Sequence, residues 1–322
     1  MTLRRQLGTR SRGRAAWAGF YGLTAAFALI LTACGTTTSG PGGHTTGGAV
    51  PTSTVACPTD SASWHLVNSG QLTIASDTTY APAEYPDPNN VSKFIGYDMD
   101  LAREIARRLC LTANIEKATF NAIIPDIYQA ALGQQRYDMS ISSFTINNDR
   151  LKNVDMVPYF QAGESILTTT ANAGSIKQIS DMCGKIIAVQ NATVEQGELK
   201  DANGVGDGTS GQSPVCKQAN KPITIVSNDD QGVVVADVLN GRADASYQDQ
   251  PVTDYYAKLH SDQLVDSGIT VQPSPEGIVM RKDNPALEQA VKMALDNMRS
   301  DGTYLRILTA WGQQKLAYPP LS

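Results

Sequence analysis

From residue 71 to residue 311 the chain alternates short apolar runs with amphipathic helical patterns. Strands that alternate with helices usually pair into parallel sheets covered by helices, so this order predicts an α/β fold with mostly parallel sheets. A length of 322 residues fits about two domains. The expected strands are residues 72–75, 114–117, 137–141, 185–189, 223–226 and 243–247. The expected helices are residues 98–109, 124–132, 194–200, 233–239, 249–259, 285–299 and 303–311.

The segment from Met1 to Ala33 has the pattern of an export signal. Residues 1–14 carry five arginines and no acidic residue, and residues 15–33 are apolar apart from one tyrosine and two threonines. A basic segment followed by an apolar segment is typical of a secretory signal peptide, which is excluded from fold reasoning. The apolar run is almost long enough to span a bilayer, so an uncleaved anchor is the alternative.

Leu31-Thr32-Ala33-Cys34-Gly35 closes the apolar run and resembles the lipobox of bacterial lipoproteins. In a lipobox the cysteine sulfur receives diacylglycerol, and the signal is cut just before it. This resemblance implies a lipid on Cys34 and a position on the extracytoplasmic face of a bacterial cell membrane. Residues 35–54 are small or uncharged. A composition of this kind predicts a flexible linker, so residues 34–56 are expected to be a tether.

Net charge limits the partners of the remaining chain. The whole sequence has 26 basic and 31 acidic residues, so removal of a signal with five arginines and no acid changes the net charge from −5 to −10. Nucleic-acid binding needs clustered Lys and Arg, so nucleic acid is not an expected partner. The three histidines, His44, His65 and His260, are too scattered for a histidine metal site or a catalytic triad. We therefore expect no metal and no cofactor.

Four cysteines remain after Cys34. In an exported chain an even number of cysteines indicates disulfides, although four cysteines allow three pairings. We favour Cys57 with Cys110 and Cys183 with Cys216, because each pair then stays within one region of the chain. Four buried free thiols are the alternative.

Polar side chains follow two of the expected strands. Ser142-Ser143-Phe144-Thr145 and then Arg150 follow one strand, and Gln248-Asp249 ends another. In α/β sheets, ligands bind beyond the carboxyl ends of the strands. Arg offers a planar fork to a carboxylate, and Asp complements an ammonium group. Arg150 and Asp249 together predict a clamp for a zwitterionic α-amino acid, whereas either residue alone is more often a surface ion-pair partner.

From about Leu72 to Trp311 the chain resembles family 3 of the bacterial extracellular solute-binding proteins, the polar amino-acid-binding proteins of ABC importers. The resemblance rests on motifs that occur in the family's order. They are Gly96-Tyr97-Asp98-Met99-Asp100-Leu101-Ala102, Ile124-Pro125, Arg136-Tyr137-Asp138, Ser142 to Thr145 with Arg150, Val154-Asp155, Gly184-Lys185, Gly241-Arg242-Ala243-Asp244-Ala245 and Asp301-Gly302-Thr303-Tyr304.

The resemblance implies a two-lobed periplasmic-binding-protein fold of type II, whose lobes are joined by two hinge strands and close on the ligand. The first lobe would comprise residues 57–163 and 275–322, and the second lobe would span the range 164–274. The crossings would lie near residues 161–164 and 271–276. The protein would be a monomer without enzymatic activity, and its partners would be an amino acid and a membrane permease.

The resemblance also implies a role for each site residue. Arg150 would bind the ligand α-carboxylate with help from the Thr145 and Thr193 hydroxyls. The Ser143 carbonyl and Asp249 would receive the α-ammonium, and Tyr80 and Phe120 would form aromatic walls. The implied ligand-binding residues are therefore Tyr80, Phe120, Ser143, Thr145, Arg150, Thr193 and Asp249.

Three positions depart from the family pattern and affect the expected specificity for the ligand side chain. They are Ala83 in place of a frequent Phe, Ala192 in place of Gly and Val194 in place of Thr. We interpret Glu84 as structural, and Asp98 and Asp100 as helix-start residues. Two rival functions remain. One is a dehydratase-like enzyme with Glu195 or Glu84 as general acid, and the other is a module that presents ligand to a receptor.

Overall fold

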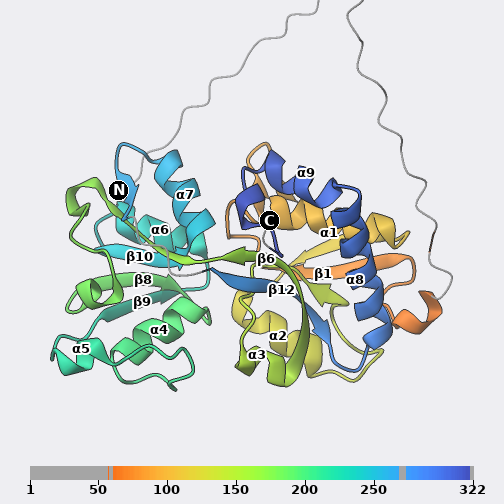
Figure 1. Ribbon diagram of the computed structural model, residues 1–322, viewed down its shortest axis with the longest axis horizontal. Coiled ribbons are helices and arrows are strands. Elements are labelled where there is room, and N and C mark those ends of the chain that lie inside the picture. The colour runs from red at the N-terminus through yellow and green to blue at the C-terminus, as the bar shows by residue number, and fades with distance from the viewer. Residues whose placement is uncertain (1–56, 58–60, 268–272, 320–322) are drawn as a thin grey trace, which may run out of the picture. The chain divides into compact units, whose positions relative to one another are not determined.

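The computed structural model describes residue 57 and residues 61–267 and 273–319 (Figure 1). These residues build two separate five-stranded sheets and a small two-stranded sheet. The first large sheet has the order β4-β1-β5-β12-β6 and the second β11-β7-β10-β8-β9. We call the part of the chain around the first sheet lobe 1 and the part around the second sheet lobe 2. The strands are β1 (Gln71–Ser76), β2 (Tyr85–Asp87), β3 (Asn90–Ile95), β4 (Thr112–Lys117), β5 (Met139–Ser140), β6 (Val154–Ala162), β7 (Glu164–Thr169), β8 (Ile186–Gln190), β9 (Thr224–Asn228), β10 (Ala245–Asp249), β11 (Leu264–Asp266) and β12 (Ser274–Arg281).

Each large sheet contains one strand that runs against the other four. In lobe 1, β1 is parallel to β4 and β5, whereas β12 is antiparallel to both of its neighbours. In lobe 2, β8 is parallel to β9 and β10, whereas β7 is antiparallel to both of its neighbours. The expectation of mostly parallel sheets is therefore confirmed.

Helices cover both faces of each sheet, as expected. The α-helices are α1 (Tyr97–Arg108), α2 (Phe120–Tyr128), α3 (Asn148–Asn153), α4 (Val194–Ala202), α5 (Val215–Gln218), α6 (Gln231–Leu239), α7 (Gln250–Leu259), α8 (Pro285–Ser300) and α9 (Thr303–Ala310). In lobe 1, α1, α8 and α9 pack into one apolar cluster and α2 into another. In lobe 2, α4 and α5 belong to one cluster and α6 to a second. Each sheet is thus packed against helices on both faces. This packing fixes the carboxyl ends of the strands, where the candidate site lies.

The chain passes from lobe 1 to lobe 2 with almost no intervening segment. β6 ends at Ala162 and β7 begins at Glu164, so Gly163 alone separates a strand of one sheet from a strand of the other. β12 pairs antiparallel with β6, and Figure 1 shows the two strands side by side at the junction of the lobes. Residues 271 and 272 of the expected second crossing lie outside the described residues.

Three local predictions were wrong. The helix expected to begin at Asp98 begins one residue earlier, at Tyr97, with Gly96 as its N-cap. Gly96 has φ +133, and a Cβ there would lie 1.9 Å from the Ala83 carbonyl oxygen, so only glycine fits. The helix expected at residues 124–132 spans Phe120–Tyr128 instead, because its buried face starts at Phe120 and includes Ile123 and Ile127. The strand expected at residues 137–141 is paired only at Met139–Ser140.

Both favoured disulfides are present. Cys57–Cys110 has a Cα–Cα distance of 5.6 Å, and Cys183–Cys216 has one of 5.0 Å. The first ties the N-terminal segment to the end of α1, and the second joins α5 to the segment before β8, within lobe 2. In the described ranges, no helix is both long enough and apolar enough to cross a membrane.

Candidate functional site

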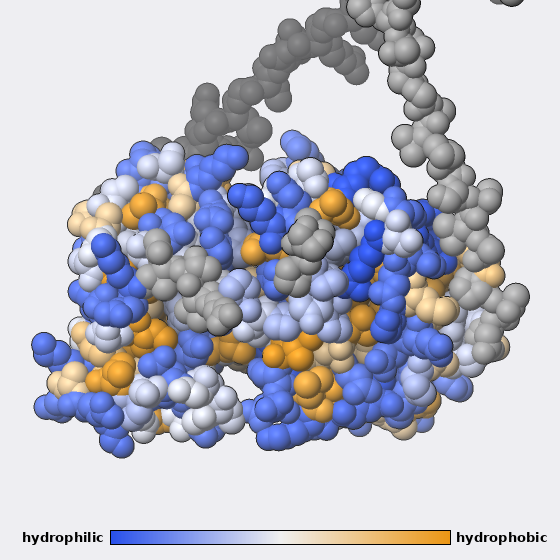
Figure 2. Space-filling model, viewed as in Figure 1, coloured by the Kyte–Doolittle hydropathy of each residue, from blue (hydrophilic) through white to orange (hydrophobic). Residues whose placement is uncertain are grey.

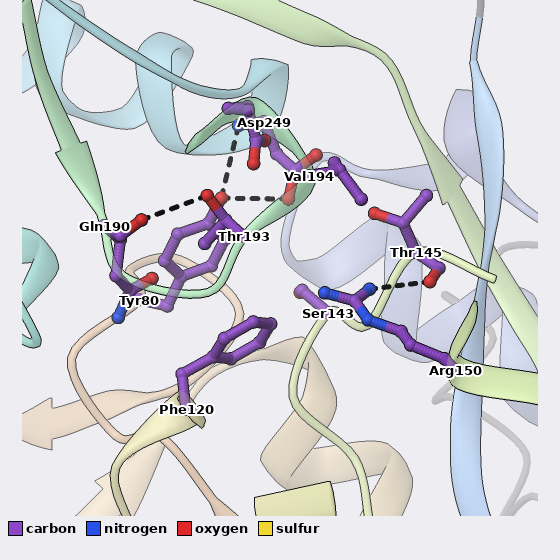
Figure 3. A pocket seen from close by; sticks show the side chains of 10 residues that line it. Tyr80, Phe120, Ser143, Thr145, Arg150, Gln190, Thr193, Val194 and Asp249 are labelled. Atoms are coloured by element: carbon purple, nitrogen blue, oxygen red, sulfur yellow. Dashed lines mark hydrogen bonds between the residues drawn. The ribbon is translucent and has the colours of Figure 1, made fainter. Parts of the chain in front are cut away.

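A small cavity lies where the two lobes meet (Figure 3). Residues from both lobes line it, at or just beyond the carboxyl ends of β1, β5, β8 and β10. This is the edge at which α/β sheets bind ligands. The lining residues are Tyr80, Phe120, Ser143, Thr145, Arg150, Gln190, Thr193, Val194, Glu195 and Asp249. All seven residues predicted from the sequence are thus brought together, and Gln190, Val194 and Glu195 join them.

Arg150 is held on an aromatic platform. Asn147, the N-cap of α3, accepts a 2.9 Å hydrogen bond from the Arg150 backbone N–H, and Arg150 Nη1 donates to the Thr145 carbonyl at 2.6 Å. The guanidinium carbon lies 5.0 Å from the ring centroid of Phe144 and 5.5 Å from that of Phe120. These two rings stack 4.2 Å apart. Cation–π contacts and the hydrogen bond to the Thr145 carbonyl therefore orient the fork toward the cavity (Figure 3).

Burial lowers the pKa of Arg150 to about 10, while the negative charges of nearby acids oppose this shift. The guanidinium is therefore positively charged at neutral pH. A planar cation of this kind can form two parallel hydrogen bonds to a carboxylate.

Asp249 ends β10 and faces the cavity from lobe 2 (Figure 3). Its Oδ2 accepts a 2.9 Å hydrogen bond from the Tyr80 hydroxyl of lobe 1, and its backbone N–H donates to the same hydroxyl oxygen at 3.2 Å. Burial raises the pKa of the Asp249 carboxyl well above its usual range, and the neighbouring Glu276 and Glu164 raise it further. A cation placed beside Asp249 would lower that pKa and stabilise the carboxylate.

The N-terminus of α4 points at the same cavity. Thr193 caps this helix, and its hydroxyl accepts a hydrogen bond from Gln196 N at 3.3 Å and donates to the Gln190 carbonyl at 3.1 Å. The Thr193 hydroxyl is thus already engaged with the backbone. The free N–H groups at the start of a helix attract anions, so this end of the cavity also suits a carboxylate.

Ala192, one of the three departures from the family pattern, has φ +63. This left-handed conformation is easy for glycine and strained for alanine. The Ala192 carbonyl accepts a 3.4 Å hydrogen bond from Arg150 Nη2 across the lobes. A residue in a sparsely populated conformation therefore contacts the residue expected to bind the carboxylate.

Acidic residues behind the cavity support its walls. Asp98 is fully buried and accepts hydrogen bonds from the Ser143 backbone N–H at 3.1 Å and from the Tyr159 hydroxyl at 2.7 Å. It thereby holds Ser143 in a left-handed conformation with φ +46. Glu84 accepts a 2.6 Å hydrogen bond from the Ser142 hydroxyl and does not line the cavity, which agrees with its structural interpretation.

Several direct contacts join the lobes beside the cavity. Besides the Tyr80–Asp249 hydrogen bond, Gln190 Nε2 donates to Asp77, and Gln231 N donates to the Thr79 hydroxyl at 3.2 Å. Val252 of α7 packs into the large apolar cluster of lobe 1. These contacts hold the lobes together around the site.

A wider hollow adjoins the cavity. Residues of α3 and α4 line it, and it shares Thr145, Arg150, Thr193 and Val194 with the cavity. Figure 2 shows the hollow as the notch between the two lobes at the lower edge of the view. Glu164 and Glu198 also line it. Within the part of the chain that is described, no group of three or more His, Cys, Asp or Glu side chains is arranged to hold a metal ion.

The chain matches the model of the bacterial extracellular solute-binding proteins, family 3, over residues 72–314. It belongs to this family. An arginine-binding protein of Corynebacterium glutamicum is 27% identical to this family 3 protein over 248 residues, which cover 77% of this chain and 76% of the relative. The histidine-binding periplasmic protein of Escherichia coli is 27% identical over 246 residues, or 73% of this chain and 85% of that protein.

Solved structures agree with the family assignment. An ancestral arginine-binding protein bound to arginine has a TM-score of 0.65 and 28% identity to this family 3 protein, over 76% of this chain and 98% of that one. The predicted family and the two-lobed fold are confirmed. The three relatives are named for the amino acid that they bind and not for a reaction, in agreement with the expectation of a non-enzymatic protein.

Two residues near the cavity have roles that the sequence did not reveal. The Phe144 ring packs against the Arg150 guanidinium. From the sequence, Phe144 was identified only as part of the Ser142–Thr145 motif, with no role of its own. Glu195 lines the cavity, although it was considered only as a general acid in the enzyme alternative. Its position in the first turn of a helix that begins at a strand end could have indicated a binding role.

Proposed function

We propose that this family 3 protein captures an α-amino acid outside the cytoplasm and delivers it to an ABC importer in the membrane. The observation that carries the proposal is that a cationic side chain from one lobe and an acidic side chain from the other line the same cavity. Arg150 of lobe 1 offers a fork for the α-carboxylate, and Asp249 of lobe 2 offers a carboxylate for the α-ammonium. The arginine- and histidine-binding relatives support the same class of ligand.

Each end of the amino acid would meet matched chemistry. The α-carboxylate would lie between the Arg150 guanidinium and the N-terminus of α4, both of which favour an anion. The α-ammonium would share the Asp249 carboxylate with the Tyr80 hydroxyl. Phe120 and Tyr80 would cover the carbon skeleton. A ligand bound to both lobes at once stabilises the closed arrangement.

A thermal-shift screen tests this proposal. The protein without residues 1–56 is heated with each of the common L-amino acids. It is then heated with N-acetyl and amide derivatives of any amino acid that stabilises it. We expect at least one amino acid to raise the unfolding temperature, because ligand binding stabilises the folded state by mass action. Both blocked derivatives should fail, since each removes one charge of the zwitterion. An unchanged unfolding temperature with every amino acid would count against the proposal.

The proposal includes hinge closure. The single residue between β6 and β7 and the pairing of β6 with β12 support a hinge at this junction. We retain residues 57–163 with 275–322 and residues 164–274 as the proposed lobe limits. Small-angle scattering should show a smaller radius of gyration when a bound amino acid is present. An unchanged radius with the protein saturated would contradict closure.

The proposal also includes the lipid anchor. Cys34 lies outside the described residues, and the support for its modification is the lipobox-like Leu31-Thr32-Ala33-Cys34 after the apolar run. In cells fed a labelled fatty acid, the wild-type protein should carry the label, and Cys34→Ala should accumulate as an unlabelled precursor. Label on the Cys34→Ala protein would refute the anchor.

A further inference from the structure

Glu195 is a buried acid in the wall of the cavity. It is the second residue of α4, and 2% of its surface is exposed. Its Oε1 has no hydrogen-bond partner among the described residues. In the same ranges, no ion pair joins it to a Lys or Arg side chain. A buried carboxyl group with an unused oxygen is costly, and such groups are concentrated at functional sites.

The electrostatics of the cavity connect Glu195 to Arg150. Among the acids that stabilise the charged form of Arg150, Glu195 contributes most, followed by Asp249 and Glu276. The α-carboxylate of an amino acid would become the direct partner of Arg150 under the proposed function. Glu195 would then be left as a second negative charge next to a neutralised guanidinium. It needs a positive charge of its own to remain ionised in this buried position.

The net charge of the cavity wall also indicates that Glu195 needs a positive partner. The wall carries one positive side chain, Arg150, and two acidic ones, Asp249 and Glu195. Burial raises the pKa of both acids, so each needs a nearby positive charge to remain ionised. With both acids ionised, a zwitterionic amino acid adds one charge of each sign and leaves the wall with one excess negative charge. An amino acid with a cationic side chain adds a further positive charge and balances the wall.

A second acid extends the negative region beyond the cavity. Glu164 on β7 lies directly opposite Asp249 on β10, and both are more than nine-tenths buried. Burial raises the pKa of both carboxyl groups, that of Glu164 to about 8, and Glu164 Oε2 has no hydrogen-bond partner within the described part of the chain. Glu164 lines the hollow that adjoins the cavity. A cationic group reaching out of the cavity would therefore meet a second unsatisfied carboxyl group.

We propose that the ligand is an amino acid with a cationic side chain and that Glu195 is the residue that pairs with this charge. The inference rests on the proposed function and specifies its ligand. Asp249 takes the α-ammonium, Arg150 the α-carboxylate, and Glu195 the distal cation, with Glu164 beyond it.

Arginine and citrulline provide the decisive comparison, because citrulline has nearly the same shape and lacks the positive charge. Calorimetric titration of the wild-type protein without residues 1–56 should give an affinity for arginine at least about 30-fold higher than for citrulline, as expected for a buried charge pair. Affinities within about threefold of each other would overturn the inference while leaving the proposed function intact. Absence of binding by every amino acid would overturn both.

Variants assign the effect to Glu195. Glu195→Gln should weaken arginine binding by about 30-fold or more and leave citrulline binding within about threefold, so that the preference disappears. Glu164→Gln should weaken arginine binding by a smaller factor. Glu288→Gln, on α8 in lobe 1, removes the same charge far from the cavity and should keep the wild-type preference. A Glu195→Gln protein that still prefers arginine 30-fold would refute the role of Glu195.

Discussion

The hydroxyl of Tyr80 in lobe 1 donates a 2.9 Å hydrogen bond to the Asp249 carboxylate in lobe 2. The two residues are 169 positions apart, and their contact lies in the wall of the cavity. The acid proposed to hold the ligand ammonium is therefore positioned by the opposite lobe. We therefore expect ligand contact and lobe closure to be coupled through the Tyr80 side chain.

Tyr80→Phe tests this coupling because it keeps the aromatic wall and removes only the hydroxyl. One oxygen of a buried carboxylate then loses its donor, which typically costs about 1–3 kcal/mol. We expect ligand affinity by calorimetry to fall by about 5-fold or more. Tyr128→Phe, on α2 away from the cavity, is the matched control. Equal affinities for Tyr80→Phe and wild type would show that the hydroxyl does not position Asp249 for binding.

The strained alanine beside Arg150 gives a prediction of opposite sign to most substitutions. Ala192 has φ +63, so Ala192→Gly should relieve strain and raise the free energy of unfolding by about 1 kcal/mol. Ala173→Gly, where φ is −50, should instead lower it by about 0.4–1 kcal/mol through unfolded-chain entropy. Urea unfolding measures both. A lower stability for Ala192→Gly would mean that the alanine methyl group makes a net favourable contribution.

The Cys183–Cys216 disulfide should stabilise lobe 2. It closes a loop of 33 residues, which corresponds to about 3–4 kcal/mol in the chain-entropy model. The double variant Cys183→Ser with Cys216→Ser should lower the free energy of unfolding by this amount, measured by denaturant titration under oxidising conditions. Peptide mapping that recovers both wild-type cysteines as free thiols would contradict the bridge itself.

Buried acids should make the ligand-free protein less stable as pH rises. Burial raises the pKa of both Glu84 and Asp98, which lie close together in lobe 1. Between pH 5 and 8 the folded state therefore binds more protons than the unfolded state, whose carboxyl groups titrate near pH 4. Their stabilising effect is complete below pH 4 and is lost as pH rises through the folded pKa values, at about 1.4 kcal/mol per pH unit for each extra proton.

Comparison of unfolding temperatures at pH 5 and pH 8 measures this dependence. Glu84→Gln should reduce the loss of stability between the two values, because it removes one of the groups that titrate. Asp262→Asn, at an exposed position in lobe 2, should leave the dependence as in wild type. A wild-type protein that becomes more stable from pH 5 to pH 8 would contradict the raised pKa values.

The fold could be predicted from the sequence because its signals are local. Alternating apolar runs and helical patterns follow from which faces of each element are buried, and these gave the α/β class and most elements. The errors arose where a contact with a residue distant in the sequence determines where an element begins or ends. Helix α1 starts after Gly96 because the Ala83 carbonyl approaches it, and no pattern near residue 96 reveals that approach.

The site was predictable in part for the same reason. Arg150 and Asp249 follow strand ends, a local signal, whereas the roles of Tyr80, Phe120 and Thr193 came from the family resemblance. The stack of Phe144 on Phe120 joins the segment after β5 to the start of α2. Glu195 shares the cavity wall with Tyr80 and Arg150 of the other lobe. Neither of these features is encoded in a local pattern.

In the proposed function, Arg150 and Asp249 bind the two ends of one ligand from two lobes. Calorimetry of Arg150→Ala and Asp249→Ala, with the amino acid found by the thermal-shift screen, tests this most directly. Each variant should bind about 30-fold to several thousand-fold more weakly than wild type, because one charge of a buried pair loses its partner. The double variant should be little worse than either single variant, since loss of one end already prevents closure. Affinity within about threefold of wild type for Asp249→Ala would contradict the clamp.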